Sequence, residues 1–174
     1  LLLRDSKGLE WLDTSEEGFW KSFFCAIVVL PGYILLLAFS PTPYYDDAGV
    51  VRIVLVESAA YVIGWTAWPL LVSYVTPAID REDKYIRYIV AYNWSAAIQI
   101  GVYVVVLLLR FSGVVPEGLM GLISFASLVI LLWYQWFIAK TGLEITGALP
   151  IAFVGGEFLL GQIIRAVTYN FLHV

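Results

Sequence analysis

Residues 86–110, IRYIVAYNWSAAIQIGVYVVVLLLR, decide the fold, because no charged side chain lies between Arg87 and Arg110. A helix needs about 20 predominantly apolar residues to cross the hydrocarbon core of a bilayer, and this stretch is long enough. Apolar runs of similar length lie on both sides of it along the chain. The pattern predicts an all-α protein, a polytopic bundle of transmembrane helices.

The composition of the whole chain agrees with a membrane protein. Of its 174 residues, 61% are hydrophobic and 14% are charged, and the mean hydropathy is +0.85, whereas soluble domains average about 45–50% apolar and 25% charged residues. This apolar content excludes a disordered chain, and a single cysteine, Cys25, excludes an internal disulfide framework. The formal net charge of −4 provides no basic surface for nucleic acid, so no nucleic-acid partner is expected.

Turn signals divide the chain into five spans. Proline, glycine or clustered charge separates the apolar runs, most clearly in the charged segment 80–87. Residues 1–17 are expected to form an interfacial amphipathic segment, and residues 18–174 a five-helix transmembrane domain. The expected spans are 18–39, 50–75, 86–110, 119–138 and 147–172.

The start of the first span carries a local signal. Thr14 and Glu17 have the spacing of a capping box, which predicts that the helix begins there. Inside the span, Pro31 and Gly32 predict a kink. Trp11 and Trp20 are expected to be interfacial anchors, because tryptophan concentrates at the boundary between membrane and water.

Basic residues predict the orientation. Seven of the ten lysines and arginines fall on one side of the predicted membrane, at Arg4, Lys7, Lys21, Arg81, Lys84, Arg87 and Lys140. Cytoplasmic loops are enriched in lysine and arginine, so we expect the N-terminus in the cytoplasm and the C-terminus outside. The expected location is a bacterial inner membrane, with the lipid bilayer as the first partner.

Polar residues at membrane depth are the main functional candidates, because an ionisable group in the bilayer is costly unless it is paired or hydrated. The candidates are Glu57, Gln99, Glu157, Gln162 and Arg165. In one interpretation Glu57 and Arg165 form a helix-to-helix ion pair, with Arg52 as a competing partner for Glu57. Glu157 is then protonated or hydrogen-bonded to Asn93, Gln99, Gln135 or Gln162. In the other interpretation the five candidates line a polar path on which Glu157 carries protons.

Small residues recur every four positions on three of the expected helices and predict close helix packing. They are Ala60 and Gly64, Ala97 and Gly101, and Ala148, Ala152 and Gly156. Ordinary packing within the bundle explains them. The alternative is that one of these faces binds another membrane subunit.

Catalytic chemistry has no support in the sequence. The lone histidine, His173, and Cys25 provide neither a metal-ligand set nor a base beside a nucleophile. No glycine-rich phosphate loop follows a strand. We therefore expect that the protein is not an enzyme and that it binds neither a metal nor a cofactor.

Two stretches near the N-terminus carry a family resemblance. The chain resembles bacterial relatives of the Yip family of five-helix membrane proteins. The resemblance rests on the five spans, a cytoplasmic N-terminal segment, and the stretches Glu10-Trp11-Leu12-Asp13 and Gly18-Phe19-Trp20. The stretch Thr14 to Trp20 also resembles small inner-membrane proteins of alphaproteobacteria. Either resemblance implies a membrane-organising or accessory role.

Two functions follow from these observations. The first is a non-enzymatic accessory, scaffold or assembly subunit of a larger membrane complex, whose partners are other membrane subunits or a second copy of the chain. The alternative is a proton-coupled transporter or permease for a small solute, which uses Glu57, Glu157 and Arg165.

Overall fold

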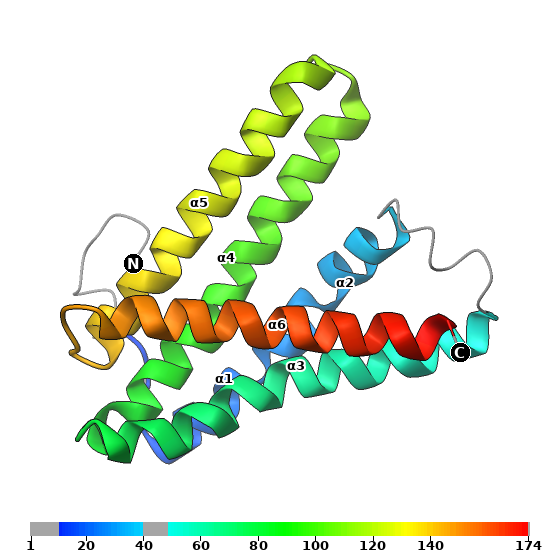
Figure 1. The fold of residues 1–174 in the computed structure, drawn as a ribbon. Coiled ribbons are helices and arrows are strands. Elements are labelled where there is room, and N and C mark those ends of the chain that lie inside the picture. Colours follow the sequence, from blue (N-terminus) through cyan, green and yellow to red (C-terminus); the bar gives the residue numbers. More distant parts are fainter. Residues whose placement is uncertain (1–10, 40–48, 174) are drawn as a thin grey trace.

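The computed structural model describes residues 11–39 and 49–173. Within these two ranges the chain is helical and contains no strand, and five helical stretches are long and apolar enough to cross a membrane (Figure 1). The predicted all-α class and the number of candidate spans are confirmed. Residues 1–10 of the predicted interfacial segment lie outside the described residues, as does most of the connection between the first two spans.

The helices follow the predicted spans closely, with small shifts at their ends in both directions. Two helices, α1 and α2, make up the first span, and the short 3-10 helix η3 leads directly into α4. The bounds are α1 Glu16–Ser22, α2 Cys25–Ala38, α3 Val50–Ala78, η3 Glu82–Lys84, α4 Tyr85–Ser112, α5 Glu117–Gly142 and α6 Leu149–His173.

The first helix begins one residue later than the capping box predicts. Ser15, not Thr14, is the N-cap: its hydroxyl oxygen accepts a hydrogen bond from the Gly18 amide at 3.0 Å. The Asp13 carboxylate accepts a hydrogen bond from the Ser15 amide, also at 3.0 Å, and this turn positions Ser15 at the cap. Glu17 pairs with Lys21 at 2.6 Å in place of the predicted capping role.

The first span is interrupted at Phe23 and Phe24, whereas α2 continues across Pro31 as one helix. The Phe23 and Phe24 amides donate to carbonyls three residues back, those of Trp20 and Lys21, so the helix tightens at this point. The interruption at Phe23 and Phe24 was not predicted, and the predicted kink position, Pro31 and Gly32, lies within α2.

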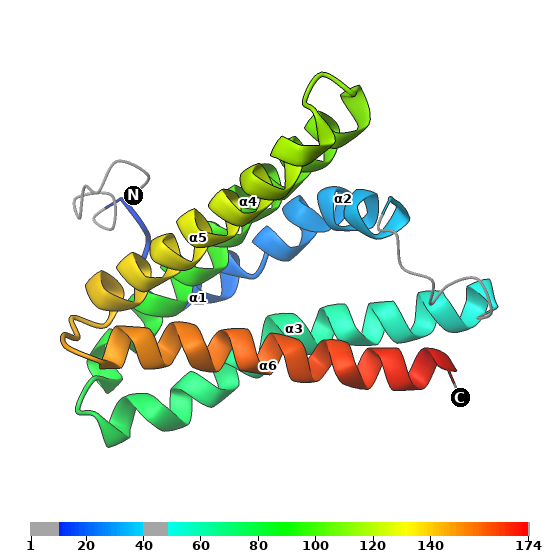
Figure 2. The same ribbon diagram turned by 45° about the horizontal axis from the view of Figure 1, so that its top comes forward.

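The long helices form two pairs. α4 and α5 are an antiparallel hairpin, joined by a turn in which Gly113 adopts a φ of 65°. α3 and α6 lie side by side although they are distant in sequence (Figures 1 and 2). α2 packs on α4, and α5 packs on α6. The two pairs meet at one end of the molecule and diverge toward the other, which we call the closed end and the open end (Figure 1).

The hydrophobic core lies at the closed end. It is built from the last turns of α3 and α5 and the first turns of α4 and α6. Gly142 allows close approach here, since a Cβ atom at this position would lie 3.2 Å from the Tyr88 Cα atom. The buried core residues are Trp68, Val72, Tyr88, Ile89, Ala91, Tyr134, Ile138, Ala139, Leu143, Ile145 and Phe153.

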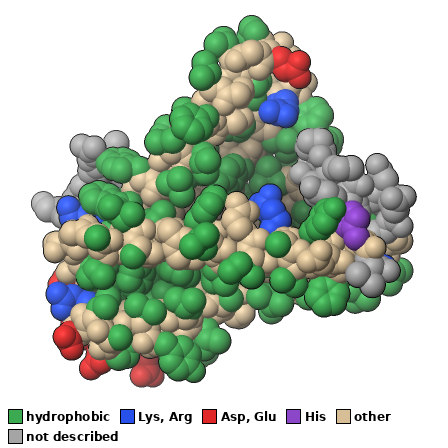
Figure 3. Space-filling view, in the orientation of Figure 1, with side chains coloured by type: hydrophobic (Ala, Val, Ile, Leu, Met, Phe, Trp, Pro, Cys, Tyr) green, Lys and Arg blue, Asp and Glu red, His purple; other side chains and the backbone are tan. Residues whose placement is uncertain are grey.

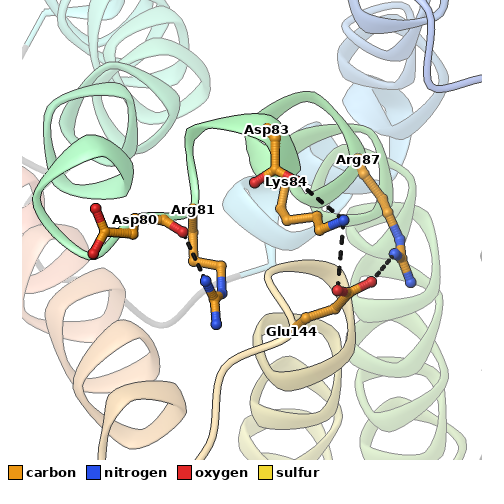
Figure 4. Close-up of polar contacts among 6 residues, drawn as sticks. All are labelled: Asp80, Arg81, Asp83, Lys84, Arg87 and Glu144. Carbon is orange, nitrogen blue, oxygen red and sulfur yellow. Dashed lines mark hydrogen bonds and ion pairs between the residues drawn. The ribbon is translucent and has the colours of Figure 1, made fainter.

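Ion pairs join the two connections at the closed end (Figure 4). The Glu144 carboxylate accepts a hydrogen bond from the Arg87 guanidinium at 2.6 Å and lies 3.5 Å from the Lys84 ammonium. Lys84 also pairs with Asp83 at 3.1 Å. The hydrogen bond from Arg87 holds the pKa of Glu144 below its usual value. These contacts link the start of α4 to the connection between α5 and α6.

Candidate functional site

Two open cavities lie between the helices, where the helix pairs begin to diverge. The first, of about 220 Å³, is bounded by α4, α5 and α6, and the second, of about 270 Å³, lies mainly between α2, α3 and α4. Gln99, Tyr103 and Glu157 line both cavities. The space-filling view shows a hollow between the α4–α5 hairpin and α6, with a basic side chain in it (Figure 3).

Glu157 lies at the junction of the two cavities. It projects from the middle of α6, is partly buried, and accepts a hydrogen bond from the amide nitrogen of Gln135 on α5 at 3.4 Å. The Tyr92 side chain on α4 also interacts with this carboxyl group. No basic side chain among the described residues forms an ion pair with Glu157. Of the hydrogen-bond partners for Glu157 expected from the sequence, Gln135 is the one that forms the bond.

Arg165 lies two turns further along α6 and lines the first cavity together with Gln99 and Gln162. Its guanidinium makes no hydrogen bond or ion pair within ranges 11–39 and 49–173. Tyr103 interacts electrostatically with both Arg165 and Glu157 and lines the same cavity as they do. Four of the five predicted polar candidates therefore line one cavity.

Glu57, the fifth candidate, lines neither of these cavities. Its carboxylate accepts a hydrogen bond from the Tyr33 hydroxyl on α2 at 3.0 Å. The competing cation, Arg52, donates to the Phe171 carbonyl at 2.8 Å. The expected ion pair between Glu57 and Arg165 is not formed within the described part of the chain.

Three aromatic side chains pack together at the closed end, next to the α6 segment that carries Glu157. The Trp68 indole nitrogen donates to the Tyr88 hydroxyl at 2.9 Å, and the Phe153 ring meets both rings edge-on, with centroids 6.0 Å and 5.8 Å away. Gly156, next to Glu157, faces Trp68, and a Cβ atom there would lie 3.3 Å from the indole. We call Trp68, Tyr88 and Phe153 the aromatic cluster. It separates Glu157 from the charged connections.

The predicted small-residue faces have three different environments. Gly156 packs on Trp68, and Ala97 lies beside the buried Cys25, so these two mediate helix contacts. Ala60 and Gly64 line the second cavity. The remaining members of these faces are exposed: Gly101, Ala148 and Ala152.

The two predicted anchors are exposed, Trp11 at 88% and Trp20 at 71% of their surface. In the part of the chain that the structure describes, histidine, cysteine and carboxylate side chains form no group that could hold a metal ion.

The cavity residues that were not predicted from the sequence include four tyrosines. Tyr92 and Tyr103 line the second cavity from α4, and Tyr33 and Tyr61 line it from α2 and α3. A signal for the α4 residues was present, because Tyr92, Ala96, Gln99 and Tyr103 recur at three- and four-residue intervals and so share one helix face.

Comparisons with known proteins give no match. No model of a protein family matches the chain, and neither a curated protein nor a solved structure matches it. The resemblance to the Yip family stays a prediction.

Proposed function

We propose that this chain is an integral membrane protein with its closed end in the cytoplasm, in a bacterial inner membrane. Five candidate spans support insertion. Basic residues support the orientation, because Lys21, Arg81, Lys84, Arg87 and Lys140 belong to the closed end, whereas Arg52 and Arg110 belong to the open end. The N-terminus is then cytoplasmic and the C-terminus lies outside.

We propose further that the protein is a proton-coupled permease for a small polar solute. The observation that carries this proposal is the position of Glu157, which lines both cavities and interacts with Gln135 and Tyr92. An ionisable group at membrane depth is rare and is most often part of a substrate or proton pathway. A carboxyl group shared by two cavities is suited to exchange a proton as solute occupancy changes.

In the proposed resting state, the aromatic cluster closes the path on its cytoplasmic side. A solute enters from the open end and meets Gln99, Tyr103 and Glu157 before it reaches Trp68 and Tyr88. Release to the cytoplasm then requires these two rings to separate. The five spans show no internal repeat, so we expect two copies to enclose a complete route.

Flux through proteoliposomes tests the permease. Vesicles with the purified protein and a trapped pH indicator are given an inward proton gradient and a panel of organic acids, amino acids and sugars. At least one solute should accelerate proton entry, and Glu157→Gln should abolish the acceleration. Glu117→Gln is the matched control, since Glu117 is an exposed carboxyl at the start of α5 and lines neither cavity. Unaltered flux in Glu157→Gln contradicts the proposal.

The second candidate is an accessory or assembly subunit of a larger membrane complex. Its specific support is the exposed set of small residues, Gly101, Ala148 and Ala152, which would let another helix approach closely. Crosslinking in native membranes and size analysis in mild detergent test this candidate. A protein that runs alone and crosslinks to nothing excludes it.

A further inference from the structure

Arg165 is an arginine inside a membrane-spanning helix without a partner in the described residues. It lies eight residues before the end of α6, about 12 Å along the helix axis. A cation at this depth is costly unless a counter-charge or water accompanies it. Arg165 is exposed at the cavity, so either water or a ligand of opposite charge can accompany its guanidinium.

Three other arginines of the described residues provide a comparison. Arg87 binds the Glu144 carboxylate, and Arg52 binds the Phe171 carbonyl. Arg110, in the last turn of α4, is exposed beside the turn at the open end. Arg165 is exposed as well, but it differs from these three because it lines a cavity between the helices.

We propose that the first cavity binds a small oxyanion, a carboxylate or a phosphate group, with Arg165 as its counter-charge. Arginine recognises both groups through two parallel N–H donors. The amides of Gln99 and Gln162 and the hydroxyl of Tyr103 line the same cavity and supply neutral donors around the anion. A volume of about 220 Å³ suits a small organic acid or a single headgroup.

Glu157 lines the same cavity as Arg165, at the end nearer the aromatic cluster. It lies eight residues from Arg165, about 12 Å along α6, so the two charges do not neutralise each other directly. Gln135 already donates to the carboxyl group. A bound anion is therefore attracted to the Arg165 side of the cavity and repelled from the Glu157 side, and the two ends of the site have opposite preferences.

The proposed oxyanion would also be the substrate of the proposed permease. Transport of the anion therefore rests on the proposed function, whereas binding of the anion does not. If the anion binds but no solute-driven proton entry is found, the oxyanion site stands and the permease fails. If a neutral or cationic solute drives proton entry and no anion binds, the permease stands and the oxyanion site fails.

Thermal unfolding of the purified full chain in detergent tests the site. The soluble probes are lactate and inorganic phosphate, at constant ionic strength balanced with chloride, and the lipid probe is phosphatidylglycerol in mixed micelles. A ligand that binds only the folded protein raises Tm in a saturable manner. We expect such a rise with at least one probe, and an apparent affinity at least tenfold lower in Arg165→Gln.

Two further variants keep the result interpretable. Arg165→Lys retains the charge and should keep part of the Tm rise. Arg110→Gln removes an exposed arginine outside both cavities and should keep all of it. A rise with lactate or phosphate identifies a free solute, and a rise with phosphatidylglycerol alone identifies a lipid headgroup; both support the site. No rise with any probe, or an undiminished rise in Arg165→Gln, overturns it.

Discussion

The two ends of α4 differ although one helix forms both. At the closed end Tyr88 is 2% exposed and Ile89 is fully buried, whereas at the open end Tyr103 is 37% and Phe111 is 60% exposed. The α4 residues that line the second cavity run from Tyr92 to Tyr103, beyond the buried core. The bundle is thus held by a core at one end, and its divergent end leaves room for polar groups.

The largest effect should come from the aromatic cluster. Tyr88→Ala removes a buried ring that accepts a hydrogen bond from Trp68 and meets Phe153 edge-on, so unfolding should become easier by about 3–5 kcal/mol. Thermal unfolding in detergent measures the change. Tyr103→Ala is the counterpart at the open end and should cost less than about 1 kcal/mol, as surface-like positions do. Equal losses would show that the core is not confined to the closed end.

A smaller effect is expected from one added methyl group. Gly142→Ala places a Cβ atom 3.2 Å from the Tyr88 backbone, which cannot move without shifting α4, and such overpacking costs about 1–3 kcal/mol. Gly101→Ala meets nothing within 4 Å and should stabilise the helix by roughly 0.5–1 kcal/mol. The two variants should move Tm in opposite directions. A shift of the same sign in both would remove the distinction between the ends.

The sequence predicted the positions of the helices along the chain better than it predicted which side chains contact one another. Spans and depths follow from apolar runs, and the spacing of Glu157, Gln162 and Arg165 along α6 already places them near one another. Depth does not determine which way a side chain points around the helix axis, and Glu57 bonds Tyr33 on α2 instead of reaching Arg165. The cap at Ser15 depends on a hydrogen bond to Asp13 that spacing alone does not reveal.

The divergence of the helix pairs could not be predicted for a different reason. A lipid-facing surface and a helix-facing surface are equally apolar, so hydrophobic patterning does not separate them. Gly64 and Gly156 look alike in the sequence, yet one lines a cavity and the other faces Trp68.

The smallest effect is expected at the charged connections of the closed end. Glu144→Gln removes the ion pairs with Arg87 and Lys84, which are partly exposed and should contribute less than about 1 kcal/mol at neutral pH. The pKa of Glu144 is lower in the folded protein than its usual 4.5, so its contribution is present above that value and disappears as pH falls through the lowered pKa. Stability of the wild type and of the variant should therefore converge in acid.

Glu82→Gln is the control for this pH dependence, since Glu82 is an exposed carboxyl in η3 without an ion pair among the described residues. Its pH profile of Tm should follow that of the wild type. A difference between wild type and Glu144→Gln that persists at acidic pH would refute the assignment to Glu144.

The pairing of α3 with α6 also sets an order of assembly. α3 ends at Ala78 and α6 begins at Leu149, so the whole α4–α5 hairpin is synthesised between these two neighbours. A chain made from its N-terminus presents α3 before its main partner exists, whereas α4 meets α1 and α2 as soon as it emerges. α6 is therefore translated after the other described helices and supplies α3 with its principal contact, so truncation within α6 leaves α3 without that contact.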